Sequence, residues 1–246
     1  MRILQLGLLS YRDALLLMED LHGAVVADSS LEDILLVVEH PPVVTMGLRE
    51  RSLDLLTAES RLAEQSVEFY RIDRGGSVTV HEPGQLVLYP IVRVDARLLT
   101  VRKLVWALEE AMIFECARWG LQAARDSINP GVWIGQDKVG AVGVRVANHV
   151  SKHGLALNVS NSLATFSHIV PCGIHGRGVT SIALSRQKIA AQHQHPSVVH
   201  SPSAATQQSP NLSGEEPLLE MSLPTIGARV SADLKNLLEG FRAGKS

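Results

Sequence analysis

The run Ile34-Leu35-Leu36-Val37-Val38 constrains the fold of this chain more than any other stretch of its sequence. It is continuously apolar and rich in β-branched side chains, which is typical of a β-strand buried on both faces. Other elements of the chain must therefore cover each side of this strand. His40-Pro41-Pro42 ends the strand, because proline cannot donate a hydrogen bond to a neighbouring strand.

The remaining segments predict a mixture of helices and strands. Ser10 is a suitable N-cap for an amphipathic helix over residues 11–27. Thr100 is a suitable N-cap for a second helix, which runs to about Trp119 and is ended by Gly120. Short extended segments are predicted over residues 3–6, 43–47, 67–72, 85–92, 131–134, 138–146 and 152–159.

The composition argues against several classes of protein. A formal net charge of −2 over 246 residues, with no basic stripe, argues against nucleic-acid binding. No apolar run is long enough to span a bilayer, and residues 1–7 lack the hydrophobic core of a signal peptide. Only two cysteines occur, so a disulfide framework is not expected and a reducing compartment fits better. We therefore expect a cytoplasmic protein with neither a nucleic-acid nor a membrane partner.

The composition changes sharply over residues 186–216, which are rich in Gln, His, Ser, Ala and Pro. Such a segment buries too little apolar surface to order itself, so we expect a flexible insertion. Its histidines are not expected to form a metal site. A C-terminal helix is predicted over residues 230–241, with one apolar face that packs back on the core. The chain is thus expected to form a single domain over residues 1–246.

The two cysteines differ in their surroundings. Cys116 lies on the apolar stripe of the helix that follows Thr100 and is expected to be a buried, unreactive thiol. Cys172 stands between Pro171 and Gly173, a combination that can present a thiol from a tight turn beside free backbone N–H groups. Taken alone, this triplet is more typical of an ordinary turn with a half-buried thiol.

Two further segments are candidates for a binding site. Arg74-Gly75-Gly76 allows the backbone to approach a ligand closely, with the guanidinium as a fixed donor. The alternative is a glycine hairpin with a surface arginine. Lys138 follows the turn Gly135-Gln136-Asp137 and enters a strand of small residues, where a substrate has room to approach. The alternative is a solvated surface charge.

Four ordered blocks of the sequence together resemble one enzyme family. They are residues 74–85, residues 131–143, residues 153–158 and residues 169–181. The set resembles the octanoyl-[acyl-carrier-protein]:protein N-octanoyltransferases of lipoate synthesis, over about residues 3–184. The resemblance implies an α+β fold of mixed β-sheets with flanking helices, like the catalytic domain of the biotin and lipoate protein ligases.

The resemblance also implies an activity. An octanoyl group would pass from octanoyl-acyl carrier protein to a cysteine thioester and then to a lysine of a lipoyl domain, the first step of endogenous protein lipoylation. The acceptors would be the lipoyl domains of 2-oxoacid dehydrogenases and the glycine-cleavage H protein. Neither a cofactor nor a metal is expected.

By position in the matched blocks, Cys172 corresponds to the acyl-carrying cysteine and Lys138 to its partner. Two roles are open for Lys138, which would either favour the thiolate or accept a proton from the incoming amine. His81 is expected to line the site, whereas His153 is either a site residue or an ordinary strand histidine. The segments that the resemblance places at the acyl site are Arg74, Gly75, Gly76, Ser77, Val78, Thr79, Val80, His81, Ala141, Val142, Gly143, Gly154, Leu155 and Ala156.

The sequence departs from the usual pattern of the family at Ser77, Val80, Glu82 and Gly140. Glu82, which stands where glycine is usual, adds a carboxylate near the expected mouth of the site. Three other functions are open from the sequence. They are an ATP-dependent lipoate-protein ligase, an inactive acyl-binding protein and a simple thioesterase.

Overall fold

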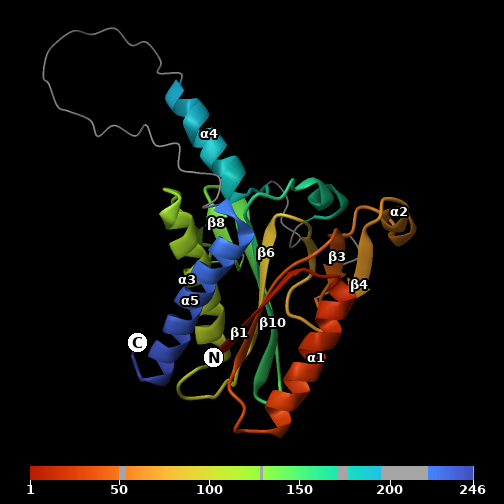
Figure 1. Ribbon diagram of the computed structural model, residues 1–246. Coiled ribbons are helices and arrows are strands. Elements are labelled where there is room, and N and C mark those ends of the chain that lie inside the picture. Colours follow the sequence, from red (N-terminus) through yellow and green to blue (C-terminus); the bar gives the residue numbers. More distant parts are fainter. Residues whose placement is uncertain (50–53, 128–129, 171–176, 195–220, 246) are drawn as a thin grey trace, which may run out of the picture.

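The computed structural model describes residues 1–49, 54–127, 130–170, 177–194 and 221–245, which form two β-sheets and their flanking helices (Figure 1). Among these residues the larger sheet has seven strands, in the order β1-β2-β6-β10-β9-β8-β7. Its strands are β1 (Arg2–Leu8), β2 (Ile34–Glu39), β6 (Gln85–Ile91), β7 (Ala124–Arg125), β8 (Val132–Ile134), β9 (Asp137–Ala147) and β10 (Val150–Asn158). The smaller sheet, in the order β4-β3-β5, is made of β3 (Val43–Met46), β4 (Glu68–Arg71) and β5 (Val78–His81).

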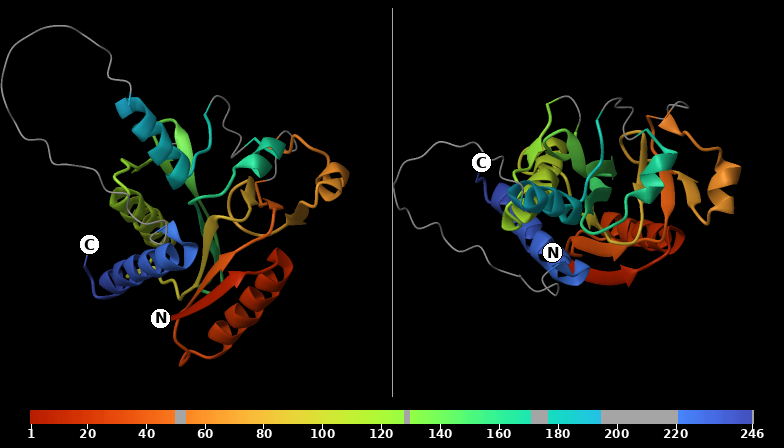
Figure 2. Two further views of the ribbon diagram at one scale, coloured as in Figure 1. Left: turned by 45° about the horizontal axis from the view of Figure 1, so that its top comes forward. Right: turned by 90° about the horizontal axis from the view of Figure 1, so that it is seen from above.

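Helices cover both faces of the larger sheet. Helix α1 (Tyr11–Ala27) lies on one face, and α3 (Val101–Arg118) and α5 (Leu223–Arg242) lie together on the other (Figure 1, Figure 2). Leu35 of β2 packs in the cluster that contains the buried side chains of α3 and α5. Leu36, its neighbour, packs in the cluster that contains those of α1. The prediction of a strand buried on both faces, with helices around mixed sheets, is therefore confirmed.

The ends of the long helices also agree with the sequence. The Ser10 hydroxyl accepts a hydrogen bond from the Asp13 N–H at 3.1 Å, and the Thr100 hydroxyl accepts one from the Lys103 N–H at 3.2 Å. Each hydroxyl satisfies a backbone donor that the first turn of the helix leaves unpaired. Shorter helices are α2 (Glu59–Glu64), the 3₁₀ helix η2 (Ala164–His168) and α4 (Ile182–Gln194). No helix in the described part of the chain is long and apolar enough to cross a membrane.

Two predicted boundaries need correction. Helix α4 continues to Gln194, whereas the sequence places the start of a flexible insertion at about residue 186. The low apolar content of residues 186–194 limits how much surface they can bury, but it does not prevent a helix. They lack glycine and proline and include Gln, Lys, Ala and Arg, which are good helix formers. Helix α5 begins at Leu223 and not at 230, capped by the Ser222 hydroxyl. The rest of the predicted insertion, residues 195–216, lies outside the described residues.

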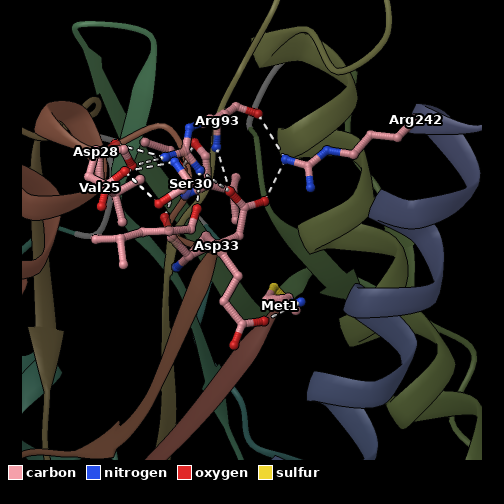
Figure 3. A network of polar contacts seen from close by, with 12 residues as sticks. Met1, Val25, Asp28, Ser30, Asp33, Arg93 and Arg242 are labelled. Carbon is pink, nitrogen blue, oxygen red and sulfur yellow. Dashed lines mark hydrogen bonds and ion pairs between the residues drawn. The ribbon is translucent and has the colours of Figure 1, made fainter.

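A network of polar contacts joins the ends of four elements (Figure 3). Arg93 follows β6, and its guanidinium donates to three carbonyl oxygens at the end of α1 and beyond it, those of Val25, Asp28 and Leu31, at 2.7–2.9 Å. The buried Asp33 carboxylate, just before β2, lies 3.6 Å from Arg93 and 2.5 Å from the guanidinium of Arg242 in α5. The network therefore fastens α1 and α5 to the same end of the sheet.

Replacing Arg93 with alanine is expected to lower the free energy of unfolding by about 2 kcal/mol, because carbonyl groups and a buried carboxylate lose donors. Urea denaturation would measure the change. The exposed Arg97 offers a matched control, and its alanine variant is expected to unfold like the wild type. Equal stability of the Arg93 variant and the control would contradict this role for the network.

Candidate functional site

A cavity of about 480 Å³ lies where the two sheets and the loop between β4 and β5 come together. Its volume is within the range of sites that bind small molecules. The lining residues come from three segments of the chain and from six single positions. They are 74–79 with His81, then 141–144 of β9, then 153–156 of β10, and finally Tyr11, Arg49, Tyr89, Val105, Pro130 and Lys138.

The predicted acyl-site residues lie around this cavity with one exception. Those that line it are Arg74, Gly75, Gly76, Ser77, Val78, Thr79, His81, Ala141, Val142, Gly143, Gly154, Leu155 and Ala156. Val80 does not, and this corrects the prediction. Side chains of a strand alternate between its faces, so Thr79 and His81 of β5 point to the cavity, and Val78, the first residue of the strand, still borders it. Val80 points the other way and is fully buried against Val44 and other apolar side chains of the smaller sheet.

The glycine loop is held between the two sheets. The Gly75 N–H donates to the Val144 carbonyl of β9 at 3.0 Å, and the Arg49 N–H donates to the Gly76 carbonyl at 3.1 Å. The guanidinium of Arg74 donates from Nη2 to the carbonyl and the hydroxyl of Thr45 in β3, at 2.8 and 2.9 Å. Arg74 therefore lines the cavity but uses these donors to anchor the loop to the smaller sheet.

Gly143 allows the loop to approach β9 this closely. A Cβ atom at this position would lie 2.9 Å from the Gly75 carbonyl oxygen and 3.1 Å from the Arg74 Cδ atom. Both distances are shorter than ordinary contacts, and one of the partners is backbone that can move only with the whole loop.

Alanine at Gly143 is therefore expected to displace the glycine loop and, for the octanoyl transfer that the sequence resemblance implies, to lower kcat/KM by about tenfold, which corresponds to ~1.4 kcal/mol. Steady-state kinetics with a thioester donor would measure this effect. Gly23→Ala in α1 is a matched control, because a Cβ atom there meets no atom within 4 Å. A Gly143 variant as active as the Gly23 variant would contradict the expected displacement.

Lys138 lines the cavity and is 5% exposed, so the alternative of a solvated surface lysine is wrong. Its Nζ atom lies 5.0 Å from the centre of the Trp133 ring in β8. Gly131, with φ +119°, passes close by, and a Cβ atom there would lie 3.3 Å from Nζ of Lys138. The ammonium is thus enclosed by β8 and by the chain that enters it.

Both flanks of the Cys172 segment are fixed by backbone hydrogen bonds. Before it, the Val170 N–H donates to the Asp54 carbonyl at 2.8 Å. After it, the Lys138 N–H donates to the Gly178 carbonyl and the Thr180 N–H donates to the Lys138 carbonyl, each at 2.9 Å. Cys172 itself lies outside the described residues, so its distance from Lys138 stays a prediction.

The other cysteine has the predicted character of a core thiol. Cys116 is fully buried in the cluster between α3 and α5. Burial, together with the nearby Glu115 carboxylate, raises the pKa of the thiol to about 12. At neutral pH it is protonated and is therefore a poor nucleophile.

Buried aromatic side chains line part of the cavity, and His40, which does not line it, packs against three of them. The Tyr11 ring stacks on His81 with 6.0 Å between ring centres, and His40 is hydrogen-bonded through Nε2 to the Tyr89 hydroxyl at 2.9 Å. Burial lowers the pKa of His81 to about 3 and those of His40 and His153 to about 4. These imidazoles are neutral at pH 7, so this wall places no histidine charge against a hydrocarbon chain.

Sequence reasoning did not find Tyr11, Tyr89 and the rim residues Arg49, Val105, Pro130 and Val144. Both tyrosines lie outside the matched blocks. Tyr11 is the first residue of helix α1, and Tyr89 stands among aliphatic residues in β6. The signal that could have found them is the low aromatic content, 4% of the chain, which makes each buried tyrosine unusual. His153, left open by the sequence, lines the cavity together with His81.

Glu82 has a different place from the one expected. It is 3% exposed and does not line the cavity, whereas the sequence suggested a carboxylate at the mouth. Its carboxylate accepts hydrogen bonds from the backbone N–H groups of Leu163 and Thr165 at 2.6 and 3.2 Å, and from the Asn161 amide at 2.9 Å. Leu163 has a φ of +63°, which an L-residue rarely adopts. Glu82 therefore stabilises the turn that leads into η2 and toward the Cys172 segment.

A pair of buried amides connects β5 with the far flank of the same segment. The Gln85 side chain bonds to the His81 imidazole at 2.7 Å and donates to the side-chain Oδ1 atom of Asn158 at 2.8 Å. Asn158 in turn donates to the Thr180 carbonyl at 3.0 Å. These contacts hold His81 in the wall of the cavity and fix the chain that runs beside Lys138.

The family model described as the lipoyl protein ligase A/B catalytic domain matches residues 10–199 of this chain. The chain belongs to this family. Related members include the octanoyltransferase of Alkaliphilus metalliredigens, 46% identical over 153 residues, which are 62% of this chain and 70% of that protein. The octanoyltransferase of Neisseria meningitidis serogroup C is 41% identical over 183 residues, 74% of this chain and 84% of that protein. The predicted resemblance to the octanoyltransferases is confirmed, and this member of the family is an acyltransferase.

Two solved structures of lipoate protein ligases have a similar fold. Lipoate-protein ligase A bound with ATP aligns with a TM-score of 0.65 and 14% identity, over 97% of this chain and 85% of that one. A bipartite lipoate protein ligase from Thermoplasma acidophilum, studied with its E2 lipoyl domain, aligns with a TM-score of 0.58 and 15% identity, over 97% and 83%. At such identities the likeness concerns the fold alone.

Proposed function

We propose that this chain transfers an octanoyl group from octanoyl-acyl carrier protein to a lysine of a lipoyl domain, through a thioester on Cys172. One observation carries the proposal. Three segments that are far apart in the sequence line one cavity with Lys138, and the backbone of Lys138 is bonded to the chain that follows Cys172. The identity of 40–46% to octanoyltransferases supports the same conclusion.

In the first half of the reaction the Cys172 thiolate attacks the carbonyl carbon of the donor thioester. A C–S bond to Cys172 forms, the C–S bond to the carrier arm breaks, and the carrier leaves as a thiol with a proton from Lys138, which is then neutral. An unperturbed cysteine has a pKa of about 8.5 and is only a few per cent ionised near neutrality. A positive charge on Lys138, which lines the cavity, would favour the thiolate.

In the second half the neutral amine of the acceptor lysine attacks the thioester on Cys172. A C–N bond forms, the C–S bond to Cys172 breaks, and the proton lost by the amine passes to Lys138 or to the departing sulfur. Conversion of a thioester into an amide is downhill, so the reaction needs no ATP. The acceptors proposed are the lipoyl domains of 2-oxoacid dehydrogenases and the glycine-cleavage H protein.

The cavity suits a hydrocarbon substituent. Apolar side chains and glycines of β9 and β10 line it together with Lys138, and the imidazoles of His81 and His153, which also line it, are uncharged at pH 7. Burial of seven methylene or methyl groups offers about 5–6 kcal/mol of binding free energy. This gain is sufficient to hold an octanoyl group while its carbonyl carbon stays near Lys138.

Intact-mass measurement after mixing with octanoyl-acyl carrier protein tests the proposal. The wild-type chain and its Cys116→Ser variant are expected to gain one octanoyl group, which then moves to an added lipoyl domain. Release of AMP during transfer would instead identify an ATP-dependent ligase, and release of free octanoate in the presence of acceptor would identify a thioesterase. Binding of the donor without an adduct would identify an inactive acyl-binding protein. Each of these three outcomes would overturn the proposal.

A further inference from the structure

Asp73 precedes the glycine loop and contacts the larger sheet through its carboxylate. It lies 3.0 Å from Nζ of Lys152 and 3.1 Å from Nε2 of His153, both in β10. A longer contact, of 3.7 Å, joins it to the guanidinium of Arg145 in β9. Asp73 is 43% exposed, whereas the His153 side chain is 2% exposed, so the carboxylate lies on the outer side of an imidazole that lines the cavity.

His153 is held in an uncommon backbone conformation. Its φ is +58°, in the left-handed region that costs an L-residue about 1–2 kcal/mol. On one side of His153, Leu155 of β10 pairs with Leu88 of β6, and on the other side Val150 pairs with Arg93. Between these two pairs β6 contains Pro90, which has no backbone N–H to donate to β10. Such a conformation persists only when the surroundings fix it. The His153 N–H contacts the Met18 sulfur at 3.1 Å, and its imidazole contacts Asp73.

The protonation states around Asp73 favour this arrangement. Burial lowers the pKa of His153 to about 4, so the ring is uncharged at neutral pH. Because the Asp73 carboxylate can only accept a hydrogen bond, the proton of the neutral ring is assigned to Nε2, which donates to it. Partial burial alone would raise the pKa of Asp73, but the hydrogen bonds from Lys152 and His153 lower it below its usual value. Burial alone would lower the pKa of Lys152, but Glu19 and Asp73 raise it. The Asp73–Lys152 contact is therefore an ion pair at neutral pH.

Asp73 and Arg74 thus attach the loop in opposite directions. Asp73 binds β10 of the larger sheet, and Arg74 binds Thr45 in β3 of the smaller one. These two attachments and the Gly75–Val144 hydrogen bond together restrict movement of the loop away from the cavity. Neither the family resemblance nor the sequence pattern singles out Asp73.

We propose that Asp73 is a positioning residue for the acyl donor, whose carboxylate fixes the glycine loop and the His153 imidazole as two walls of the cavity. The inference rests on the proposed function, because the acyl group is what these walls would hold. Asp73 does not line the cavity, so it acts through the loop and His153 and not by contact with the substrate. Its removal should weaken binding of the donor in the ground state and the transition state alike.

Kinetics of the Asp73→Asn variant with octanoyl-pantetheine test this role. KM is expected to rise about tenfold while kcat changes less than about twofold, which is the pattern for lost uniform binding. Asp73→Glu should restore KM in part, because it returns the carboxylate. Glu19→Gln is the matched control, since it removes the other partner of Lys152 at 2.6 Å without touching the loop, and its KM should equal that of the wild type. An unchanged KM in Asp73→Asn, or an equal rise in Glu19→Gln, would overturn the proposal.

A second measurement does not depend on activity. Nitrogen-15 NMR of the histidine side chains distinguishes the two neutral tautomers, and His153 is expected to be fixed as the Nε2–H form in the wild type. In Asp73→Ala the signal should move toward the average of both tautomers, while that of His81, which is bonded to Gln85, stays in place. An unchanged His153 signal would sink the positioning role. An inactive wild type would contradict the transfer reaction alone, and the NMR result would still decide the role of Asp73.

Discussion

Serine in place of Cys172 is expected to abolish formation of the octanoyl adduct and to lower the rate of acyl transfer by at least about 10³-fold. A thiolate is the nucleophile that the proposed reaction requires, and a serine hydroxyl is almost entirely protonated at neutral pH. Nothing in the described part of the site is arranged to change this, because the two imidazoles that line the cavity, those of His81 and His153, are bonded to Gln85 and Asp73. Intact mass would follow the adduct, and a lipoyl-domain gel-shift assay would follow transfer.

Cys116 supplies the control for this variant. The Cys116→Ser chain is expected to form the adduct at the wild-type rate, because the thiol is fully buried and burial raises its pKa to about 12. It should also unfold more easily by about 1–3 kcal/mol, since a hydroxyl then lies in an apolar cluster. An adduct that survives in Cys172→Ser but is lost in Cys116→Ser would reverse the assignment of the two cysteines.

Local features of the fold could be predicted from the sequence because they depend on neighbouring residues. The Ser10 and Thr100 caps each act within one helical turn, and the helix that starts at Tyr11 has the predicted ends. The order of the strands could not be predicted in this way. Strand β1 is parallel to β2, and β3, β4 and β5 form a sheet separate from the larger one. Both arrangements depend on contacts between residues that are far apart in the chain.

Within the candidate site, sequence motifs located the segments but not the direction of each side chain. Val80 lies in a matched block, yet strand alternation turns it away from the cavity. Arg74 lies in the same block, and its guanidinium donates to Thr45 behind the loop. Tyr11, outside every block, reaches the cavity because α1 packs across β10 and β6. Motif matching thus fails where the tertiary packing decides which group faces the substrate.

Methionine in place of Lys138 is expected to lower kcat/KM for octanoyl transfer by about 10²–10⁴-fold, the usual effect of removing a group that moves a proton. Methionine keeps an unbranched chain of similar length but has neither the charge nor the donors of the ammonium. Because Lys138 is 5% exposed, water cannot readily take its place. Single-turnover measurements would separate adduct formation on the cysteine from transfer to the lipoyl domain.

Arginine at position 138 distinguishes the two roles that remain open for this lysine. A guanidinium stays protonated in proteins, so it can favour a thiolate but cannot accept a proton from the incoming amine. We expect Lys138→Arg to form the octanoyl adduct more readily than Lys138→Met and to pass it to the lipoyl domain no faster. Lys188, an exposed lysine paired with Asp137, supplies the control, because Lys188→Met removes a charge near the same strand without reaching the cavity. Wild-type rates for Lys138→Met in both half-reactions would show that the lysine of the cavity takes no part in the chemistry.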